Sequence, residues 1–157
     1  MKHRAIKNIS LTIALIVLMT GCGKSSKLSD SALRDYIQSE AQKILAGEQY
    51  AVVWIPSRSA KADFTFIVLS KINGPSLMAK EIGKLLPEAK GKNLALVIGG
   101  PNNSKNTQVI NDALDLNSKV NLKNLKIVFA GKATQLKDIK NKAERRGIDF
   151  YFIELKN

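Results

Sequence analysis

The chain has 157 residues, of which 45% are hydrophobic and 24% are charged. This length and composition indicate one compact domain and exclude wholesale disorder. A single cysteine excludes an internal disulfide framework and any metal site built from several cysteines, and the net charge of +12 requires an explanation.

The first 22 residues combine a basic start, an apolar run and a small-residue end. Lys2, Arg4 and Lys7 precede an almost wholly apolar run over residues 9–19. This run is shorter than the roughly 20 residues that a helix needs to span a bilayer. The pattern is therefore typical of a signal peptide and not of a permanent anchor.

The segment ends in Leu18-Met19-Thr20-Gly21-Cys22, which resembles the lipobox of bacterial lipoproteins, although Met19 departs from the usual leucine. In that family the chain is cut before the cysteine, which then receives a diacylglyceryl group and an N-acyl chain. The resemblance implies that residues 1–21 are a lipoprotein signal peptide and that Cys22 carries this covalent lipid. An ordinary secretory signal, or an uncleaved one, is the alternative.

The resemblance also implies a location in the cell envelope. Gly23 follows the cysteine where an aspartate is associated with retention in the inner membrane. In a cell with two membranes, the expected location is the periplasmic face of the outer membrane. Whether the cell has one membrane or two is left open by the sequence.

Residues 22–28 are small and polar and predict a short lipid-anchored tether, which keeps the folded part near the membrane surface. The remaining residues, 29–157, are predicted to form a single α/β domain. Ser29 or Ser31 can cap a first helix, whose apolar residues recur at helical spacing and which ends at Gly47.

Two strand-like runs follow the first helix. Residues 50–55 are aromatic and β-branched and end at Pro56, and residues 63–69 alternate apolar side chains. Since only a short polar loop over residues 57–61 connects them, they predict an antiparallel hairpin.

From residue 64 onward, strands and helices alternate. Ser76 opens a helix in which Pro87 marks an end or a kink, and Ser104 and Thr134 can cap two more helices. Apolar runs predict strands over residues 94–98, 127–130 and 148–155. The alternation predicts a small three-layer α/β domain, with helices on the faces of a mostly parallel sheet of about five strands that includes one antiparallel hairpin.

Several catalytic chemistries are excluded. His3 is the only histidine and leaves with the signal peptide, so a Ser-His-Asp arrangement is impossible. Acylation of Cys22 removes the only thiol, and with it zinc binding by cysteine and histidine. Asp63 and Asp149 lie at predicted strand starts, and only Glu154 comes near the carboxyl ends where a magnesium-carboxylate enzyme needs its acids. We therefore expect a protein that is not an enzyme and that holds no metal or cofactor beyond the lipid.

The loop over residues 99–107 joins a buried strand to a helix start, where free N–H groups favour anions. It departs from a phosphate-binding loop because Ser104 and Asn106 stand where a glycine and a hydroxyl residue belong. A turn with a helix cap is the favoured interpretation, and a small anion site, extended by Lys71 if the strands are neighbours, is the alternative. The candidate anion-binding residues are Gly99, Gly100, Ser104, Lys105, Lys132 and Thr134.

Positive charge is concentrated in residues 119–146, which contain nine Lys or Arg residues and only two acidic residues. A solubilising surface is the favoured interpretation. Attraction to anionic headgroups, lipopolysaccharide, an anionic envelope polymer or an acidic partner is the alternative. Nucleic acid is not expected as a partner, because aromatic and basic residues do not interleave.

Two function classes remain. The first is a non-enzymatic binding or assembly module, lipid-anchored in the cell envelope with an envelope protein or an anionic polymer as its partner. An accessory protein of a secretion, conjugation or pilus machine is an example. The alternative is a periplasmic small-anion-binding protein or histidine-independent enzyme that uses the loops around Ser104, Lys105 and Lys132.

Overall fold

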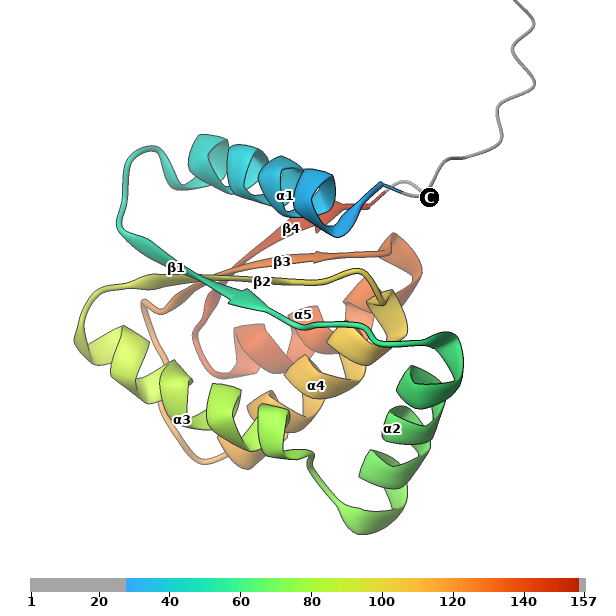
Figure 1. Ribbon diagram of the computed structural model, residues 1–157. Coiled ribbons are helices and arrows are strands. Elements are labelled where there is room, and N and C mark those ends of the chain that lie inside the picture. Colours follow the sequence, from blue (N-terminus) through green and yellow to red (C-terminus); the bar gives the residue numbers. More distant parts are fainter. Residues whose placement is uncertain (1–27, 156–157) are drawn as a thin grey trace, which may run out of the picture.

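A four-stranded sheet forms the centre of the structure, with helices on both of its faces (Figure 1). The computed structural model describes residues 28–155. The predicted signal peptide, Cys22 and all of the predicted tether except Leu28 lie outside these residues. The elements in chain order are α1 (Asp30–Leu45), β1 (Tyr50–Trp54), α2 (Ala60–Asn73), α3 (Leu77–Gly91), β2 (Ala95–Gly99), α4 (Asn103–Leu116), β3 (Lys126–Gly131), η1 (Ala133–Gln135), α5 (Leu136–Arg145) and β4 (Asp149–Glu154).

The strands are all parallel and lie in the order β1-β2-β3-β4. Because neighbouring strands are also consecutive in the chain, right-handed crossovers bring α3, α4 and α5 to one face of the sheet (Figure 1). The first helix, α1, covers the other face (Figure 1). The prediction of a three-layer α/β domain is confirmed, with four strands instead of about five.

The predicted antiparallel hairpin is wrong. Residues 63–69 belong to helix α2, and β1 pairs in parallel with β2. The side chain of Ser59 accepts a hydrogen bond from the backbone N–H of Ala62 (3.2 Å) and so caps this helix. Residues 63–69 are apolar at most positions, and such a short run fits a strand as well as a helix. The alternation of its side chains therefore does not distinguish the two structures.

Two predicted helix caps need correction, and of the two alternatives for Pro87 the helix end is wrong. Asn102, not Ser104, caps α4 by accepting from the backbone N–H of Lys105 (3.0 Å). Thr134 lies within the 3₁₀ turn η1, and α5 begins after it at Leu136. Pro87 lies inside α3, which continues to Gly91 because its buried face, not the single missing N–H, decides its length.

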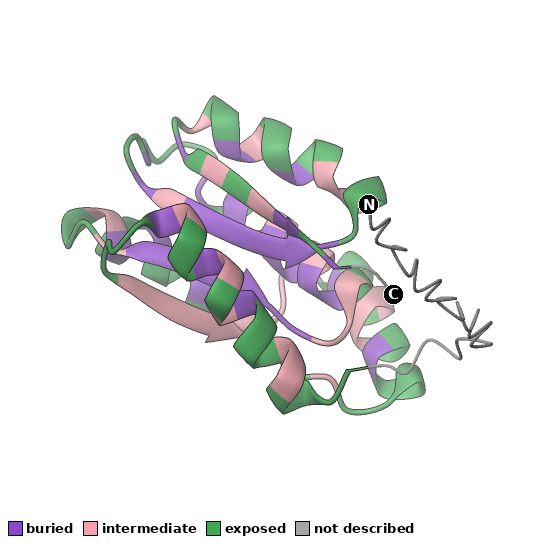
Figure 2. Cartoon of the chain, turned by 90° about the horizontal axis from the view of Figure 1, so that it is seen from above, coloured by how far each residue is buried: buried purple, intermediate pink, exposed green. Residues whose placement is uncertain are grey.

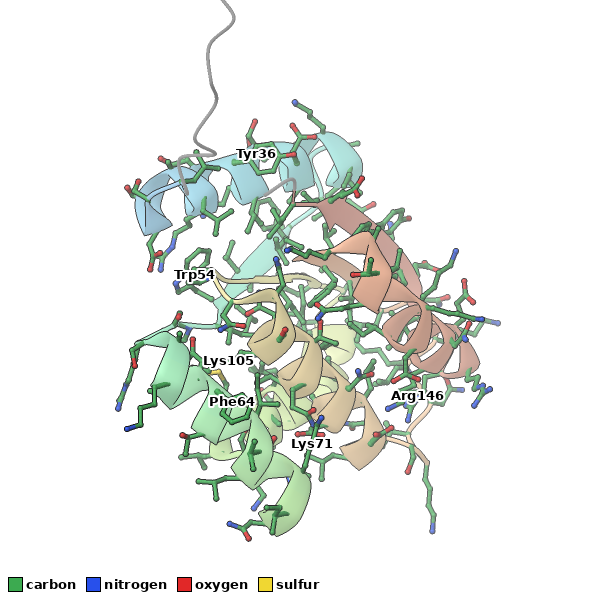
Figure 3. The ribbon with its side chains drawn as sticks, turned by 90° about the vertical axis from the view of Figure 1, so that its right-hand side faces the viewer. Tyr36, Trp54, Phe64, Lys71, Lys105 and Arg146 are labelled. Carbon is green, nitrogen blue, oxygen red and sulfur yellow. The ribbon has the colours of Figure 1, made fainter. Side chains whose placement is uncertain are left out.

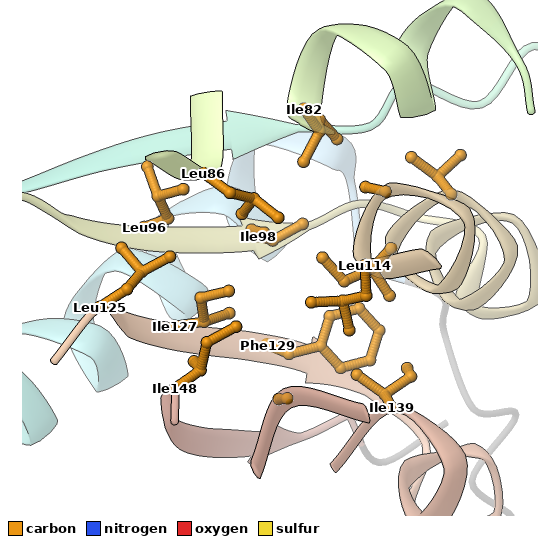
Figure 4. Packing of buried hydrophobic residues seen from close by; sticks show 14 of the residues in the cluster. Ile82, Leu86, Leu96, Ile98, Leu114, Leu125, Ile127, Phe129, Ile139 and Ile148 are labelled. Carbon is orange, nitrogen blue, oxygen red and sulfur yellow. The ribbon is translucent and has the colours of Figure 1, made fainter. Parts of the chain in front are cut away.

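The two central strands, β2 and β3, are buried on both faces, as expected for parallel strands, whereas the edge strands β1 and β4 are partly exposed (Figure 2). Along β2, Leu96 and Ile98 face the core beneath α3, α4 and α5, and Val97 faces the core beneath α1. Phe129 of β3 lies in the larger core and is fully buried (Figure 4). The two cores fix the sheet rigidly, so the loops at its edges start from defined positions.

Gly100 follows β2 at the point where the backbone approaches the end of β1. A Cβ atom at this position would lie 2.1 Å from the carbonyl oxygen of Ile55. Replacement of Gly100 by alanine is expected to lower the free energy of unfolding by about 3 kcal/mol, because backbone must shift to relieve the contact.

The matched control is Gly91→Ala in the last turn of α3, where a Cβ atom meets nothing within 4 Å. That variant is expected to be as stable as the wild type or about 1 kcal/mol more stable. Urea denaturation measures both. Equal stabilities of the two variants would contradict the close approach at Gly100.

Candidate functional site at the carboxyl edge of the sheet

The carboxyl edge of the sheet is the edge where strands β1 to β4 end, and ligands of open parallel sheets bind there. The chain also enters the domain at this edge, because α1 runs antiparallel to β1 (Figure 1). Arg34 in the first half of α1 lies over the ring of Trp54 at the end of β1, 4.7 Å from its centroid. Figure 3 looks onto this edge, with α2 and Lys105 below Trp54.

A buried ion pair lies at the centre of this edge. The Lys105 ammonium is 3.0 Å from Oδ1 of Asp63, and the two side chains are 8% and 2% exposed. The same ammonium donates to the carbonyl oxygen of Pro56 (2.6 Å) and lies 4.8 Å from the centroid of the Phe66 ring. Lys105 therefore joins α4 to α2 and to the loop after β1.

The second carboxylate oxygen of Asp63 is also occupied. It accepts hydrogen bonds from the side-chain amide of Asn102 (3.0 Å) and from the hydroxyl of Ser57. Burial alone would raise the pKa of Asp63, but the hydrogen bonds from Ser57, Lys105 and Asn102 and the charge of Lys105 outweigh burial and lower this pKa. Asp63 is thus held as a carboxylate, with partners on both oxygens.

The candidate anion-binding residues are placed unequally. Gly99 and Gly100 are buried, and Lys132 and Thr134 are exposed on the neighbouring loop. Ser104 is exposed and accepts from the side-chain amide of Gln135 (3.2 Å), whose oxygen in turn accepts from the hydroxyl of Thr107 (3.0 Å). The two loops are therefore brought together, as neighbouring strands require, but Lys105 is directed into the protein and not toward them. The anion site remains a prediction. The ammonium of Lys105 is bonded to Asp63 and to the carbonyl oxygen of Pro56, away from these loops.

The sequence does not indicate that Ser57, Asp63 and Asn102 meet around Lys105, or that Gln135 contacts Ser104. Its pattern places Asp63 in a strand, and the spacing of these residues carries no sign of their contact. The one signal was Lys105, a lysine in the first turn of a helix whose positive end disfavours it unless a carboxylate is near.

The contacts of Lys105 hold α4, α2 and the loop after β1 in one arrangement. A lysine that activates a serine must be able to lose its proton, whereas Lys105 donates to a carboxylate and a carbonyl. Residues 28–155 contain no group of three or more His, Cys, Asp or Glu side chains that could hold a metal ion.

Helix α2 presents its apolar side to the solvent. Its buried residues are the polar Asp63 and Ser70, whereas Phe64, Leu69 and Ile72 are 68%, 49% and 73% exposed. Helical spacing puts Phe64, Val68 and Ile72 on one side, away from Asp63. We name Phe64, Val68, Leu69 and Ile72 the α2 surface.

Basic side chains flank the α2 surface. Arg58 lies in the loop before α2, Lys61 in its first turn and Lys71 in its last turn, and all three are exposed. Within the described residues none of the three makes an ion pair. Exposed apolar side chains that are bordered by polar residues are a common feature of contact surfaces. No helix among residues 28–155 has the length and apolar character to cross a membrane.

Comparisons with protein families, curated proteins and solved structures find no match for this chain.

The ion pair predicts a large loss of stability in the variant Asp63→Asn. This variant leaves the Lys105 ammonium buried without a carboxylate, so the free energy of unfolding at pH 7 is expected to fall by about 3–5 kcal/mol. The double variant Asp63→Asn/Lys105→Met removes both charges and keeps the lysine stem over Phe66. It is expected to recover most of that loss in urea denaturation.

The pH dependence provides an independent check. Because the pKa of Asp63 is lowered in the folded state, its stabilising contribution is complete above the pKa of the unfolded chain, near 4, and is lost as the pH falls through the folded value. The stability of the wild type relative to the double variant should therefore fall as the pH is lowered below about 5. A relative stability that stays constant over this range would show that Asp63 is not the titrating group.

Proposed function

We propose that the chain is a lipid-anchored cell-envelope protein that acts as a non-enzymatic binding module, with the α2 surface resting on the membrane beside its anchor. The observation that carries the proposal is that α2, with its exposed apolar surface, lies at the same carboxyl edge as the start of α1, although on the other side of the sheet (Figures 1 and 3).

The length of the tether supports a lipid surface as the occupant. Only the segment from Cys22 to Leu28 separates the proposed lipid attachment from the domain, and even fully extended it reaches about 20 Å. A domain held so closely presents its carboxyl edge, with α2, to the bilayer. A partner protein or a second copy would need room in the same narrow space.

The composition of the surface agrees with a membrane interface. Transferring the exposed parts of Phe64, Leu69 and Ile72 from water into the acyl region gains roughly 3–6 kcal/mol. Arg58, Lys61 and Lys71 add attraction to anionic headgroups, of about 1 kcal/mol each at close range. Since acyl chains on Cys22 would already retain the protein, the contact through α2 sets its orientation and not its attachment.

The geometry favours this proposal over an enzyme or a small-anion-binding protein, because Lys105 is neutralised by Asp63. In a cell with two membranes, the proposed location is the periplasmic face of the outer membrane. A fixed orientation there suits an accessory protein that presents its opposite edge to an envelope partner, as in a secretion, conjugation or pilus machine.

Lipid attachment is tested by growing cells with labelled palmitate. The full-length protein is expected to incorporate the label and to fractionate with membranes, whereas Cys22→Ser loses both properties because the chain has no other thiol. Ser25→Ala, in the same segment, serves as the control and should retain both. A Cys22→Ser form that stays labelled and membrane-bound would refute the lipid anchor.

The orientation is tested by placing a fluorophore on the introduced thiol of Ile72→Cys. Acylation of Cys22 leaves this as the only reactive thiol, so the label is unique. In the lipidated protein, reconstituted in phosphatidylethanolamine–phosphatidylglycerol vesicles, brominated acyl chains are expected to quench the label at least about twofold, since bromine quenches only at contact distance and Ile72 faces the acyl region.

The matched control is Ser118→Cys, an exposed position at the opposite edge of the sheet, which should stay unquenched. Equal quenching at the two positions would contradict the proposed orientation. Burial of the label at position 72 that depends on protein concentration and not on lipid would assign the α2 surface to a second copy of the chain instead.

A further inference from the structure

The amino edge of the sheet, where the strands begin, carries a basic hollow of about 360 Å³. The loop after α4 and the end of α5 form it, and the cations that line it are Lys119, Lys123, Arg145 and Arg146. Backbone hydrogen bonds from Leu122 to Arg146 and from Asn124 to Gly147 hold the loop and the helix end together. The basic hollow thus has a rigid frame at the edge opposite to α2 and the tether.

The acidic residues near the basic hollow are already engaged. Lys142 lies 2.8 Å from Asp115 and 3.4 Å from Asp138. Burial of Lys142 opposes its charge, but the hydrogen bonds and charges of these two aspartates outweigh burial and raise its pKa. Among the described residues, Lys119, Lys123 and Arg145 have no ion-pair partner.

Arg146 has a different role from the other three cations. Its side chain is 9% exposed, and its guanidinium donates to the carbonyl oxygens of Asn117 (3.4 Å) and Lys142 (2.6 Å) at the ends of α4 and α5. Each helix C-terminus carries about half a negative charge, so Arg146 offsets both. The charges of Lys119, Lys123 and Arg145 are then left in excess and available to a ligand.

We infer that the basic hollow binds the oxyanion groups of an anionic polymer of the cell envelope. Its cations come from separate segments and are spread around an open hollow, which suits successive charges along a chain better than one enclosed ion. Arg145 can form paired hydrogen bonds to a phosphate or a carboxylate, and the lysines add point charges. The inference depends on the proposed function only in that the anchor turns this edge away from the membrane.

The test uses the full-length lipidated protein in neutral detergent, so that neither membrane seating nor the behaviour of α2 affects it. Binding to polyphosphate and to polygalacturonate is measured by fluorescence anisotropy over a range of salt concentrations, with neutral dextran as the blank. Polyphosphate carries phosphate groups and polygalacturonate carries carboxylates. The polymer that binds more tightly therefore shows which of the two oxyanions the basic hollow prefers. Lys119→Ser/Lys123→Ser is expected to weaken binding at low salt at least about tenfold and to make it less dependent on salt.

The control Lys80→Ser/Lys84→Ser removes the same net charge from exposed positions on α3 that do not line the basic hollow. It should weaken binding less than about twofold, because neither position belongs to the basic hollow. Equal losses in the two double variants would overturn the inference, since overall charge would then drive binding. Failure of both polymers to bind the wild type would overturn it as well, and would leave the proposed anchor and orientation unaffected.

Discussion

The buried ion pair between Asp63 and Lys105 fixes the arrangement on which the rest of the surface depends. A buried ion pair adds little net stability compared with apolar residues of the same size, because removing both charges from water cancels most of their attraction. Its effect here is to select one orientation of α2. Turning the helix about its axis would bury Phe64 and Ile72, but it would leave the Lys105 ammonium without its carboxylate. The cost of that loss, about 3–5 kcal/mol, is as large as the apolar burial to be gained.

The order of the strands separates the two ends of the molecule. When consecutive parallel strands are neighbours, α4 and α5 both begin at the carboxyl edge and end at the amino edge. Helix C-termini favour cations, so basic residues in the last turns and in the loops beyond them gather at the amino edge. Arg146 satisfies this requirement for α4 and α5, and the further cations at the same edge exceed it. Part of the positive charge in residues 119–146 therefore compensates helix C-termini, and the rest exceeds this requirement.

The sequence predicts a helix or strand correctly where the spacing of its apolar residues matches the faces that the fold buries. The first helix, β1 and the three later strands lie close to their predicted positions, because continuous apolar runs between turns leave few alternatives. The segment over residues 63–69 could not be predicted in this way, since a short apolar run fits a strand as well as a helix, and the contact between Asp63 and Lys105 joins residues far apart in the chain. The same contact reverses the expected role of Lys105, from an exposed cation of a loop to a buried link between helices. Local patterns carry no information on such a pairing, and propensity is weak enough for tertiary contacts to override it.

Ionisable groups in the interior are compensated to a different degree from those at the surface. Catalysis requires a charged or nucleophilic group that is shielded from water and still free to react. In residues 28–155 the most deeply buried ionisable side chains, Asp63 and Lys105, neutralise each other and are saturated with hydrogen bonds. Unpaired cations lie in solvent instead, both around the basic hollow and beside the exposed apolar side chains of α2. Because these two surfaces lie at opposite edges of the sheet, the proposed contacts with a membrane and with an anionic polymer do not compete for the same residues.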